Sequence, residues 1–248
     1  GAITGRMTHQ SPNMAQVPSS HSPYGHECRS CWTVPSSTKL VGFDASGLEL
    51  RMLAHYMDDK EFTDVLLTED IHTRNQMAAG LETRPQAKTF IYAFLYGAGD
   101  AKIGTIVGGS AKDGSRLKQR FLRNTPALEN LRERVGRASG RGYLRGLDGR
   151  RLHVRSEHAA LNTLLQAAGA IVMKKALVLL DDYAQQWNLN YKFIGNIHDE
   201  VQTEVSEKHA EKFGYLAVEC LKAAGLAFDL RCPLDGEYKV GNTWAETH

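Results

Sequence analysis

The stretch KLVGFDASGLELR (residues 39–51) decides how this chain folds. Residues 39–45 are apolar enough for a buried strand, Ser46-Gly47 predicts a turn, and residues 48–57 carry apolar side chains at helical spacing. Asp44 therefore lies where a strand gives way to a helix. Because a carboxylate is costly to bury unless it is paired or bound to a metal, Asp44 is a candidate functional residue.

A second acidic residue stands in a similar setting far along the chain. Residues 191–205 alternate around His198-Asp199-Glu200, which predicts a strand, a tight turn and a second strand. Two carboxylates brought together from Asp44 and Asp199 would repel unless a divalent cation lay between them, and Mg²⁺ with phosphate oxygens is the usual occupant of such a site. Taken singly, each aspartate is also an ordinary turn-forming or capping residue.

The segment after Thr83 predicts a helix with a nucleotide-binding face, because Thr83-Arg84-Pro85-Gln86 resembles a capping box. Four side chains follow at a spacing of four: Arg84, Lys88, Tyr92 and Tyr96. At about 100° per residue they form a slanted stripe on one side of the helix. Two cations and two aromatic rings suit the phosphates and the base of a nucleotide. The alternative is a helix whose long polar side chains only cover its surface.

The other segments predict a mixed α and β chain. Residues 1–40, rich in Ser, Pro and Gly, are expected to form strand and loop without a helix. The remaining expected elements are short basic helices in 108–145, a hairpin in 147–154, and helices over 159–180 and 208–224.

The composition is that of a globular protein of 248 residues, with 42% hydrophobic and 23% charged residues. It excludes disorder, collagen and coiled coil. The longest apolar run near Ala170 is broken by Lys174 and Lys175, so we expect no membrane partner. Four cysteines do not suggest a disulfide scaffold, and we expect a cytoplasmic protein, in the bacterial host if a phage encodes it.

The net charge of +2 conceals a strong segregation of charge. Residues 84–155 contain 16 Lys and Arg but only 5 Asp and Glu, which gives this block +11 and the remainder −9. A basic block of this size is typical of contact with a polyanion. A solvated basic face without a ligand is the alternative.

Two weaker motifs are open to ordinary explanations. His26-x-Cys28-x₂-Cys31 could be half of a zinc site or a redox pair, but no second CxxC exists to complete it. Gly97-x-Gly99-x₂-Lys102 suggests a phosphate loop, yet it follows a helix instead of a strand, so helix termination is the better account.

Several words of the sequence resemble motifs of family A DNA polymerases, the family of bacterial DNA polymerase I. Motifs A, B and C correspond in order to Asp44-Ala-Ser-Gly-Leu-Glu-Leu-Arg51, Arg84-x₃-Lys88-x₃-Tyr92-x₃-Tyr96-Gly97 and His198-Asp199-Glu200. Accessory matches are Thr4-Gly5-Arg6, Pro12-Asn13-x₂-Gln16-x-Pro18, Asp70-Ile71-His72 and Asn162-x₃-Gln166. The amino-acid sequence around these motifs resembles that of the replicative polymerases of T-odd phages. The resemblance covers nearly the whole chain. Motifs in this number and order are far more specific than a lone short pattern.

The resemblance implies an α/β (α+β) polymerase right-hand fold, in which an antiparallel-sheet palm carries an inserted helical fingers subdomain. The palm would comprise residues 1–55 and 146–248, and the fingers residues 56–145 with the helix 84–96. The thumb and exonuclease domains of a complete member would be absent. Either the chain is truncated, as its start at Gly1 suggests, or the natural polymerase is split and a separate polypeptide supplies them.

The resemblance also assigns roles at the reaction centre. Asp44 and Asp199, with the backbone carbonyl of Ala45, would hold two Mg²⁺ ions, for which Mn²⁺ is a possible substitute, and Glu200 would act as a helper. The residues implied to contact the dNTP are His72, Arg84, Lys88, Tyr92 and Glu49. Lys88 would also donate a proton to pyrophosphate. Glu49 would leave no room for a 2′-hydroxyl on the nucleotide sugar.

A further set would contact primer-template DNA: Arg6, Asn13, Gln16, Tyr96, Asn162, Gln166 and His198. Minor-groove acceptors occupy similar places in every Watson–Crick pair, so donors there test pair geometry without selecting a sequence.

The function implied is template-directed addition of dNTPs to a primer 3′ end by two-metal-ion phosphoryl transfer, in phage DNA replication. One alternative is a relative of single-subunit RNA polymerases, which share the metal-binding aspartates; Glu49 and the His-Asp-Glu word favour deoxynucleotides. The other is a catalytically incomplete module that binds primer-template DNA or a partner chain.

Overall fold

The computed structural model describes residues 2–248, which divide into two compact units. The sheet unit comprises residues up to 48 and residues 167–248, and the helical unit comprises residues 49–166. The division therefore falls within two helices, α2 (Leu48–Met57) and α9 (Ala160–Gln186). The palm and fingers boundaries expected at 55/56 and 145/146 lie 7 and 21 residues from these two divisions, and that assignment stays a prediction.

The sheet unit is built on four antiparallel strands in the order β4-β5-β1-β6. The strands are β1 (Thr38–Ala45), β4 (Tyr191–Ile197), β5 (Glu200–Ser206) and β6 (Gly236–Gly241). Its helices are α1 (Gly25–Ser30), α10 (Ala210–Ala227), the later part of α9, and the 3₁₀ turns η1 (Met14–Gln16) and η3 (Glu207–His209). This mixed fold with an antiparallel sheet confirms the expected fold class.

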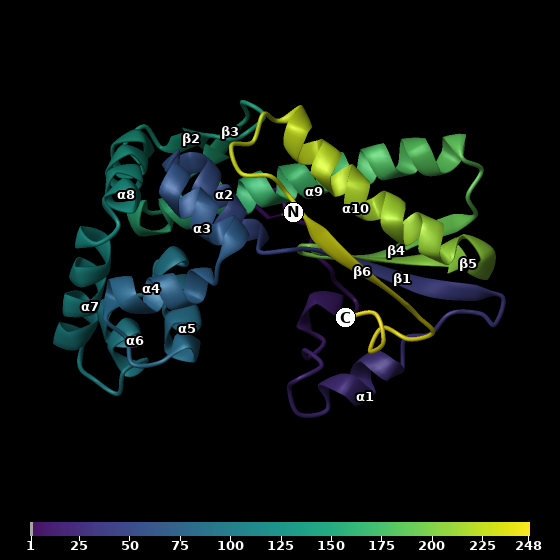
Figure 1. The fold of residues 1–248 in the computed structure, drawn as a ribbon, viewed down its shortest axis with the longest axis horizontal. Coiled ribbons are helices and arrows are strands. Elements are labelled where there is room, and N and C mark those ends of the chain that lie inside the picture. Colours follow the sequence, from purple (N-terminus) through teal and green to yellow (C-terminus); the bar gives the residue numbers. More distant parts are fainter. Residues whose placement is uncertain (1) are drawn as a thin grey trace. The chain divides into compact units, whose positions relative to one another are not determined.

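The two faces of the sheet are covered differently (Figure 1). α10 packs against β1 and β6, and the later part of α9 runs along the same side, whereas α1 and the C-terminal residues lie on the other. Phe213 of α10 is fully buried beneath the ring of Tyr191, with ring centroids 5.2 Å apart. Gly214 lets α10 approach the sheet, because a Cβ there would lie 2.1 Å from the Tyr238 ring.

The helical unit contains the remainder of the chain in short elements. They are most of α2, then α3 (Lys60–Thr68), α4 (Ile71–Ala79), α5 (Arg84–Leu95), α6 (Asp100–Thr105), α7 (Ala111–Arg123), α8 (Pro126–Ser139), β2 (Tyr143–Arg145), β3 (Arg151–His153), η2 (Glu157–Ala159) and the start of α9. Phe121 of α7 packs edge-on against Phe90 and Phe94 of α5, with ring centroids 5.1 and 5.5 Å away. These aromatic contacts centre the core on α5.

The expectation that residues 1–40 contain no helix is wrong. Both η1 and α1 form there, although local helix propensity is poor. Tyr24 adopts a left-handed conformation before α1, and Gly25 packs so closely that a Cβ would lie 1.8 Å from the carbonyl oxygen of Ser19. α1 exists because of tertiary contacts, including the burial of Arg29, which the local sequence does not reveal.

The expected helix over 159–180 is longer than predicted, because α9 continues to Gln186. The segment Glu157–Gln186 is long and apolar enough to cross a membrane, despite Lys174 and Lys175, which corrects the expectation that these lysines interrupt the run. However, 61% of its most apolar window is buried inside the protein, as in the core helix of a globular fold.

Candidate active site

Three acidic residues face one another across neighbouring strands of the sheet unit. In the register of the antiparallel sheet, Asp44 of β1 lies opposite Glu200 of β5 and Glu237 of β6. Opposed residues project from the same face, so like charges placed this way are destabilising. The sheet therefore concentrates negative charge at the end of β1.

Asp199 belongs to the two-residue turn that joins β4 and β5. Ile197 pairs with Glu200, and His198 between them has φ +64°, a left-handed conformation that costs a non-glycine residue strain. The Ala45 N–H donates to the Asp199 carbonyl oxygen at 3.2 Å, which ties this turn to the end of β1. The turn thus brings Asp199 beside the residues of motif A.

The pKa of Asp44 is shifted by its surroundings. Desolvation by the surrounding protein, followed by the charges of Asp199 and Glu200, raises the pKa of Asp44 to about 7. A cation bound at this position would offset both effects.

The donor set fits a hard divalent ion that shares its coordination with a substrate. Carboxylates of Asp44 and Asp199 and the carbonyl of Ala45 are the oxygen ligands that Mg²⁺ prefers, and Mg²⁺ is usually held by one or two carboxylates plus phosphate oxygens. No group of three His, Cys, Asp or Glu side chains able to hold a metal is found within residues 2–248.

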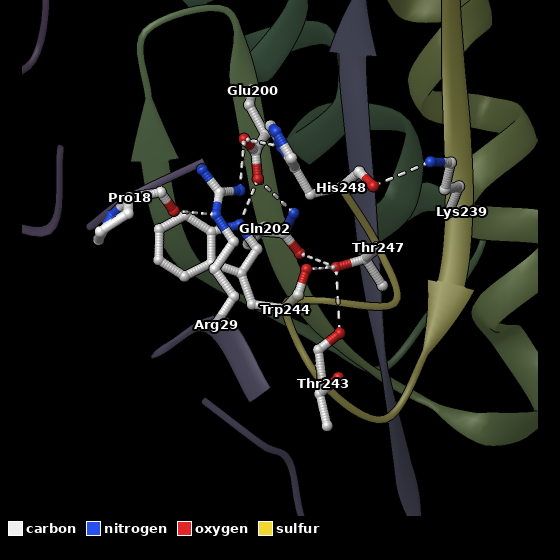
Figure 2. Close-up of polar contacts among 9 residues, drawn as sticks. All are labelled: Pro18, Arg29, Glu200, Gln202, Lys239, Thr243, Trp244, Thr247 and His248. Carbon is white, nitrogen blue, oxygen red and sulfur yellow. Dashed lines mark hydrogen bonds and ion pairs between the residues drawn. The ribbon is translucent and has the colours of Figure 1, made fainter. Parts of the chain in front are cut away.

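Glu200 is engaged by other side chains of the sheet unit instead of being open to solvent (Figure 2). Its Oε1 accepts from Trp244 Nε1 and from Gln202 Nε2 at 2.7 Å, and its Oε2 lies 2.7 Å from His248 Nδ1. Burial acts to raise the pKa of Glu200, but hydrogen bonds from His248, Gln202 and Trp244 prevail and lower it. These contacts suit a helper role better than direct metal ligation, and either role stays a prediction.

In the helical unit, the four-residue stripe lies on the side of α5 that faces away from the core. Thr83 and Gln86 form the expected capping box, and α5 runs to Leu95 with Tyr96 as its C-cap. The buried positions are Ala87, Phe90, Ile91, Phe94 and Leu95, whereas Arg84, Lys88 and Tyr96 are exposed and Tyr92 is half-buried. The core of the helical unit therefore does not include the exposed members of the stripe.

The predicted phosphate-binding residues of α4 and α5 are linked by Asp70. Arg84 Nη2 donates to Asp70 Oδ1 at 3.0 Å, its Nε contacts the other oxygen, and the N–H of His72 donates to Oδ1 at 3.2 Å. Arg84 is the main cause that lowers the pKa of Asp70 below its usual range. Partial burial, followed by the charge of Arg84, lowers the pKa of His72, whose ring lies 6.2 Å from that of Tyr92.

Glu49 and Tyr96, predicted to contact the sugar and the template base, contact each other. The Tyr96 hydroxyl lies 3.0 and 2.9 Å from the two carboxylate oxygens of Glu49 and donates to that carboxylate. The bond joins the first turn of α2 to the end of α5 and fixes where the carboxylate lies.

The predicted DNA-contacting residues come from both units. Asn13 caps η1, with its side chain accepting from the Ala15 N–H, and Gln16 ends that turn. Arg6 is half-buried, and His198 is exposed in the β4–β5 turn. Asn162 and Gln166 lie one helical turn apart on the helical-unit part of α9, both half-buried. Their contacts with DNA stay predictions.

The residues of the two weaker motifs lie at the surface of α1 and at the end of α5. Cys28 and Cys31 are exposed free thiols on α1. Gly97 follows α5 with φ +73°, which confirms helix termination as its role.

Sequence patterns did not single out the residues that surround Glu200. Arg29, Gln202, Trp244, Thr247 and His248 share no motif and come from three distant segments.

Comparisons with known proteins agree with this geometry. The sequence model described as DNA polymerase family A matches residues 1–246. The protein named DNA-directed DNA polymerase of Enterobacteria phage T3 is 43% identical over 281 aligned residues, and that of Escherichia phage T7 is equally similar. Each alignment covers 100% of this chain but 40% of the relative, so the chain spans about two fifths of the relatives' length. The chain belongs to DNA polymerase family A.

A solved structure shows the same fold. The POL domain of Pol1 from M. smegmatis, in complex with DNA primer-template and dNTP, superposes with a TM-score of 0.89 and 23% identity. The match covers 99% of this chain and 47% of that one, and at this identity it supports the fold alone.

Proposed function

We propose that this chain carries the polymerase active site of a DNA-directed DNA polymerase, which adds dNTPs to a primer 3′ end under the direction of a template. The observation that carries the proposal is the placement of Asp44 and Asp199 at one end of the sheet, where burial, followed by the charges of Asp199 and Glu200, raises the pKa of Asp44. Membership of DNA polymerase family A supports it.

The aspartates would hold the catalytic cations. Two Mg²⁺ ions, or Mn²⁺ in their place, would activate the primer 3′-hydroxyl and stabilise the charge on the transferred phosphoryl group. Asp44, Asp199 and the carbonyl of Ala45 supply the protein's oxygen ligands, and Glu200 holds its charge nearby in a fixed orientation.

The face of α5 would hold the nucleotide. Arg84 and Lys88 provide the cations for the triphosphate, and His72 adds a donor from α4. Lys88 would donate a proton to the leaving pyrophosphate. Tyr92 would lie beside the sugar, where Glu49 excludes a 2′-hydroxyl.

The basic block and the polar residues around it would hold the primer-template. The 16 Lys and Arg between residues 84 and 155 provide contacts to phosphates that do not depend on sequence. The curated relatives are more than twice as long as this chain, so thumb and exonuclease functions would come either from further residues of the same natural protein or from a separate polypeptide.

Single-nucleotide extension of a labelled primer-template by the 248-residue chain tests the proposal. We expect incorporation of the templated dNTP that requires Mg²⁺ or Mn²⁺ and is lost in Asp44→Ala and Asp199→Ala, while both variants still bind DNA. Incorporation retained by the double variant contradicts the proposal. DNA binding by a parent chain that incorporates nothing would instead favour the binding-module alternative.

The same assay with ribonucleotides alone separates the RNA polymerase alternative. Family membership and Glu49 predict that the chain uses deoxynucleotides. Extension with ribonucleotides at the rate seen with dNTPs would contradict this.

A further inference from the structure

Arg29 and Trp244 belong to none of the sequence motifs, yet both are buried against Glu200 (Figure 2). They are 5% and 3% exposed. Arg29 comes from α1 and Trp244 from the segment after β6, so two distant parts of the sheet unit meet at the residue that follows Asp199.

The contacts leave the Glu200 carboxylate little freedom. The Trp244 indole N–H donates to Oε1, and the Arg29 guanidinium carbon lies 4.3 Å from the centre of the Trp244 ring. Arg29 Nη1 lies 3.8 Å from Oε2, while its Nε donates to the carbonyl of Pro18 at 2.9 Å. The arginine is thus stacked, hydrogen-bonded and paired, which fixes both its own position and that of Trp244.

Gln202 extends the cluster to the centre of the sheet. It donates to Glu200 through Nε2 and accepts from Thr247 Oγ1 at 2.8 Å. Gly42 of β1 leaves the space for this pair, because a Cβ there would lie 2.4 Å from both Gln202 Nε2 and the Thr247 carbonyl oxygen. The glycine of the KLVGFD strand therefore serves the cluster.

The turn next to the cluster needs such support. His198 is held at φ +64°, and backbone strain of this kind persists only where the surroundings fix the conformation. The turn is tied to β1 by the bond from Ala45, and on its β5 side by Glu200. Removing the Trp244 donor weakens the hold on the buried Glu200 carboxylate, which then keeps its contacts with Gln202 and His248.

We propose that Arg29 and Trp244 are positioning residues for metal binding: they hold the Glu200 side chain, and through it they keep the His198-Asp199 turn in the conformation that presents Asp199. This inference rests on the proposed function, because it assumes that Asp199 holds a divalent cation. It assigns no metal contact to either residue.

Binding of Mn²⁺ alone to the full chain, followed by electron paramagnetic resonance, tests the inference without a measurement of activity. Trp244→Phe removes the indole donor but keeps an aromatic ring. We expect this variant to bind Mn²⁺ about 10-fold more weakly, the range seen when outer partners of a metal site are removed. Trp187→Phe is the matched control, because Trp187 also lies beneath a cation, Lys212, at 4.5 Å but is 43% exposed and has no bond to Glu200.

A double-mutant cycle decides whether Trp244 acts through Glu200. We expect Glu200→Gln to weaken Mn²⁺ binding to a similar degree, and Trp244→Phe to add nothing in the Glu200→Gln background. Effects that multiply, or parental affinity in Trp244→Phe, would overturn the inference while leaving the proposed function intact. A parent chain that binds no Mn²⁺ would overturn the metal site itself.

A second variant covers the case in which Trp244→Phe does not fold, as judged by circular dichroism. Arg29→Lys keeps the charge but cannot both donate to Pro18 and stack on Trp244. We expect it to require more Mg²⁺ for half-maximal nucleotide incorporation, with kcat regained at high Mg²⁺. A loss of kcat that Mg²⁺ does not restore, at unchanged Mg²⁺ requirement, contradicts a positioning role.

Discussion

The strand register places Asp44 opposite two glutamates, Glu200 and Glu237. The charge of Asp199 also acts on its carboxylate. In an unfolded chain an aspartate titrates near 4. The folded chain raises that pKa to about 7, so it binds a proton more tightly than the unfolded chain between these values. Without metal, the free energy of unfolding therefore falls as the pH rises from about 4 to about 7, because the folded chain resists the ionisation of Asp44.

Asp44→Asn should remove this cost. We expect the variant to be more stable than the parent in urea unfolding with EDTA at pH 8, and the advantage to shrink toward pH 4. Because Asp44 is exposed at the level of the whole residue, solvent screening makes the effect smaller than the pKa alone suggests. Asp182→Asn, at an exposed position of α9, is the control. A constant difference between parent and Asp44→Asn across this range contradicts the prediction.

The Tyr96 hydroxyl donates to the Glu49 carboxylate and holds it in one position. Under the proposed function, this carboxylate would face the sugar of the bound nucleotide. We expect Glu49→Ala to raise ribonucleotide use relative to deoxynucleotide use by at least ~10-fold in kcat/KM. Tyr96→Phe should change the ratio in the same direction by less, and unchanged discrimination in both variants would reject this role.

At the scale of elements, α5 depends on its N-terminal cap. The Thr83 hydroxyl accepts from the Gln86 N–H, and Gln86 returns the contact to the Thr83 N–H. Thr83→Ala should cost about 1 kcal/mol of stability. Because Arg84 and Lys88 follow in the first turns, we also expect a higher KM for dNTP.

Thr89→Ala provides the control within the same helix. The Thr89 hydroxyl donates to the Pro85 carbonyl one turn back, a bond that contributes little to helix stability. We expect its unfolding midpoint in urea to stay near that of the parent. Equal losses of stability in Thr83→Ala and Thr89→Ala would contradict the prediction that the Thr83 cap stabilises α5 more than the Thr89 bond does.

At the scale of the whole molecule, charge is divided between the two units. The helical unit contains 19 Lys and Arg against 14 Asp and Glu, and the sheet unit contains 11 against 14. Under the proposed function, cations would contact the phosphates of DNA and acids would hold the metal ions, so a net charge near zero would be the sum of two opposed requirements.

Salt dependence tests this division. We expect the affinity for primer-template DNA to fall linearly with salt on logarithmic axes, through release of counterions. Lys102→Gln, an exposed lysine in the basic block, should reduce that slope by about 1. Lys208→Gln removes the same charge from the sheet unit and should leave the slope unchanged. Equal slopes for all three proteins would contradict a role for the basic block.

The sequence by itself determined the elements whose signals are local. The strand before Asp44, the helix capped by Thr83 and the turn at His198 each carry their own apolar period or turn residues, and all three form as expected. The stripe on α5 was also predictable, because a helix fixes which side chains share a face.

Only the tertiary structure decided which distant residues meet. α1 has little helix propensity of its own and forms through the close packing of Gly25 and the burial of Arg29. The opposition of Asp44 and Glu200 depends on strand register, and the cluster around Glu200 depends on contacts between segments more than 40 residues apart. Such pairings follow from long-range packing, for which a local pattern contains no signal.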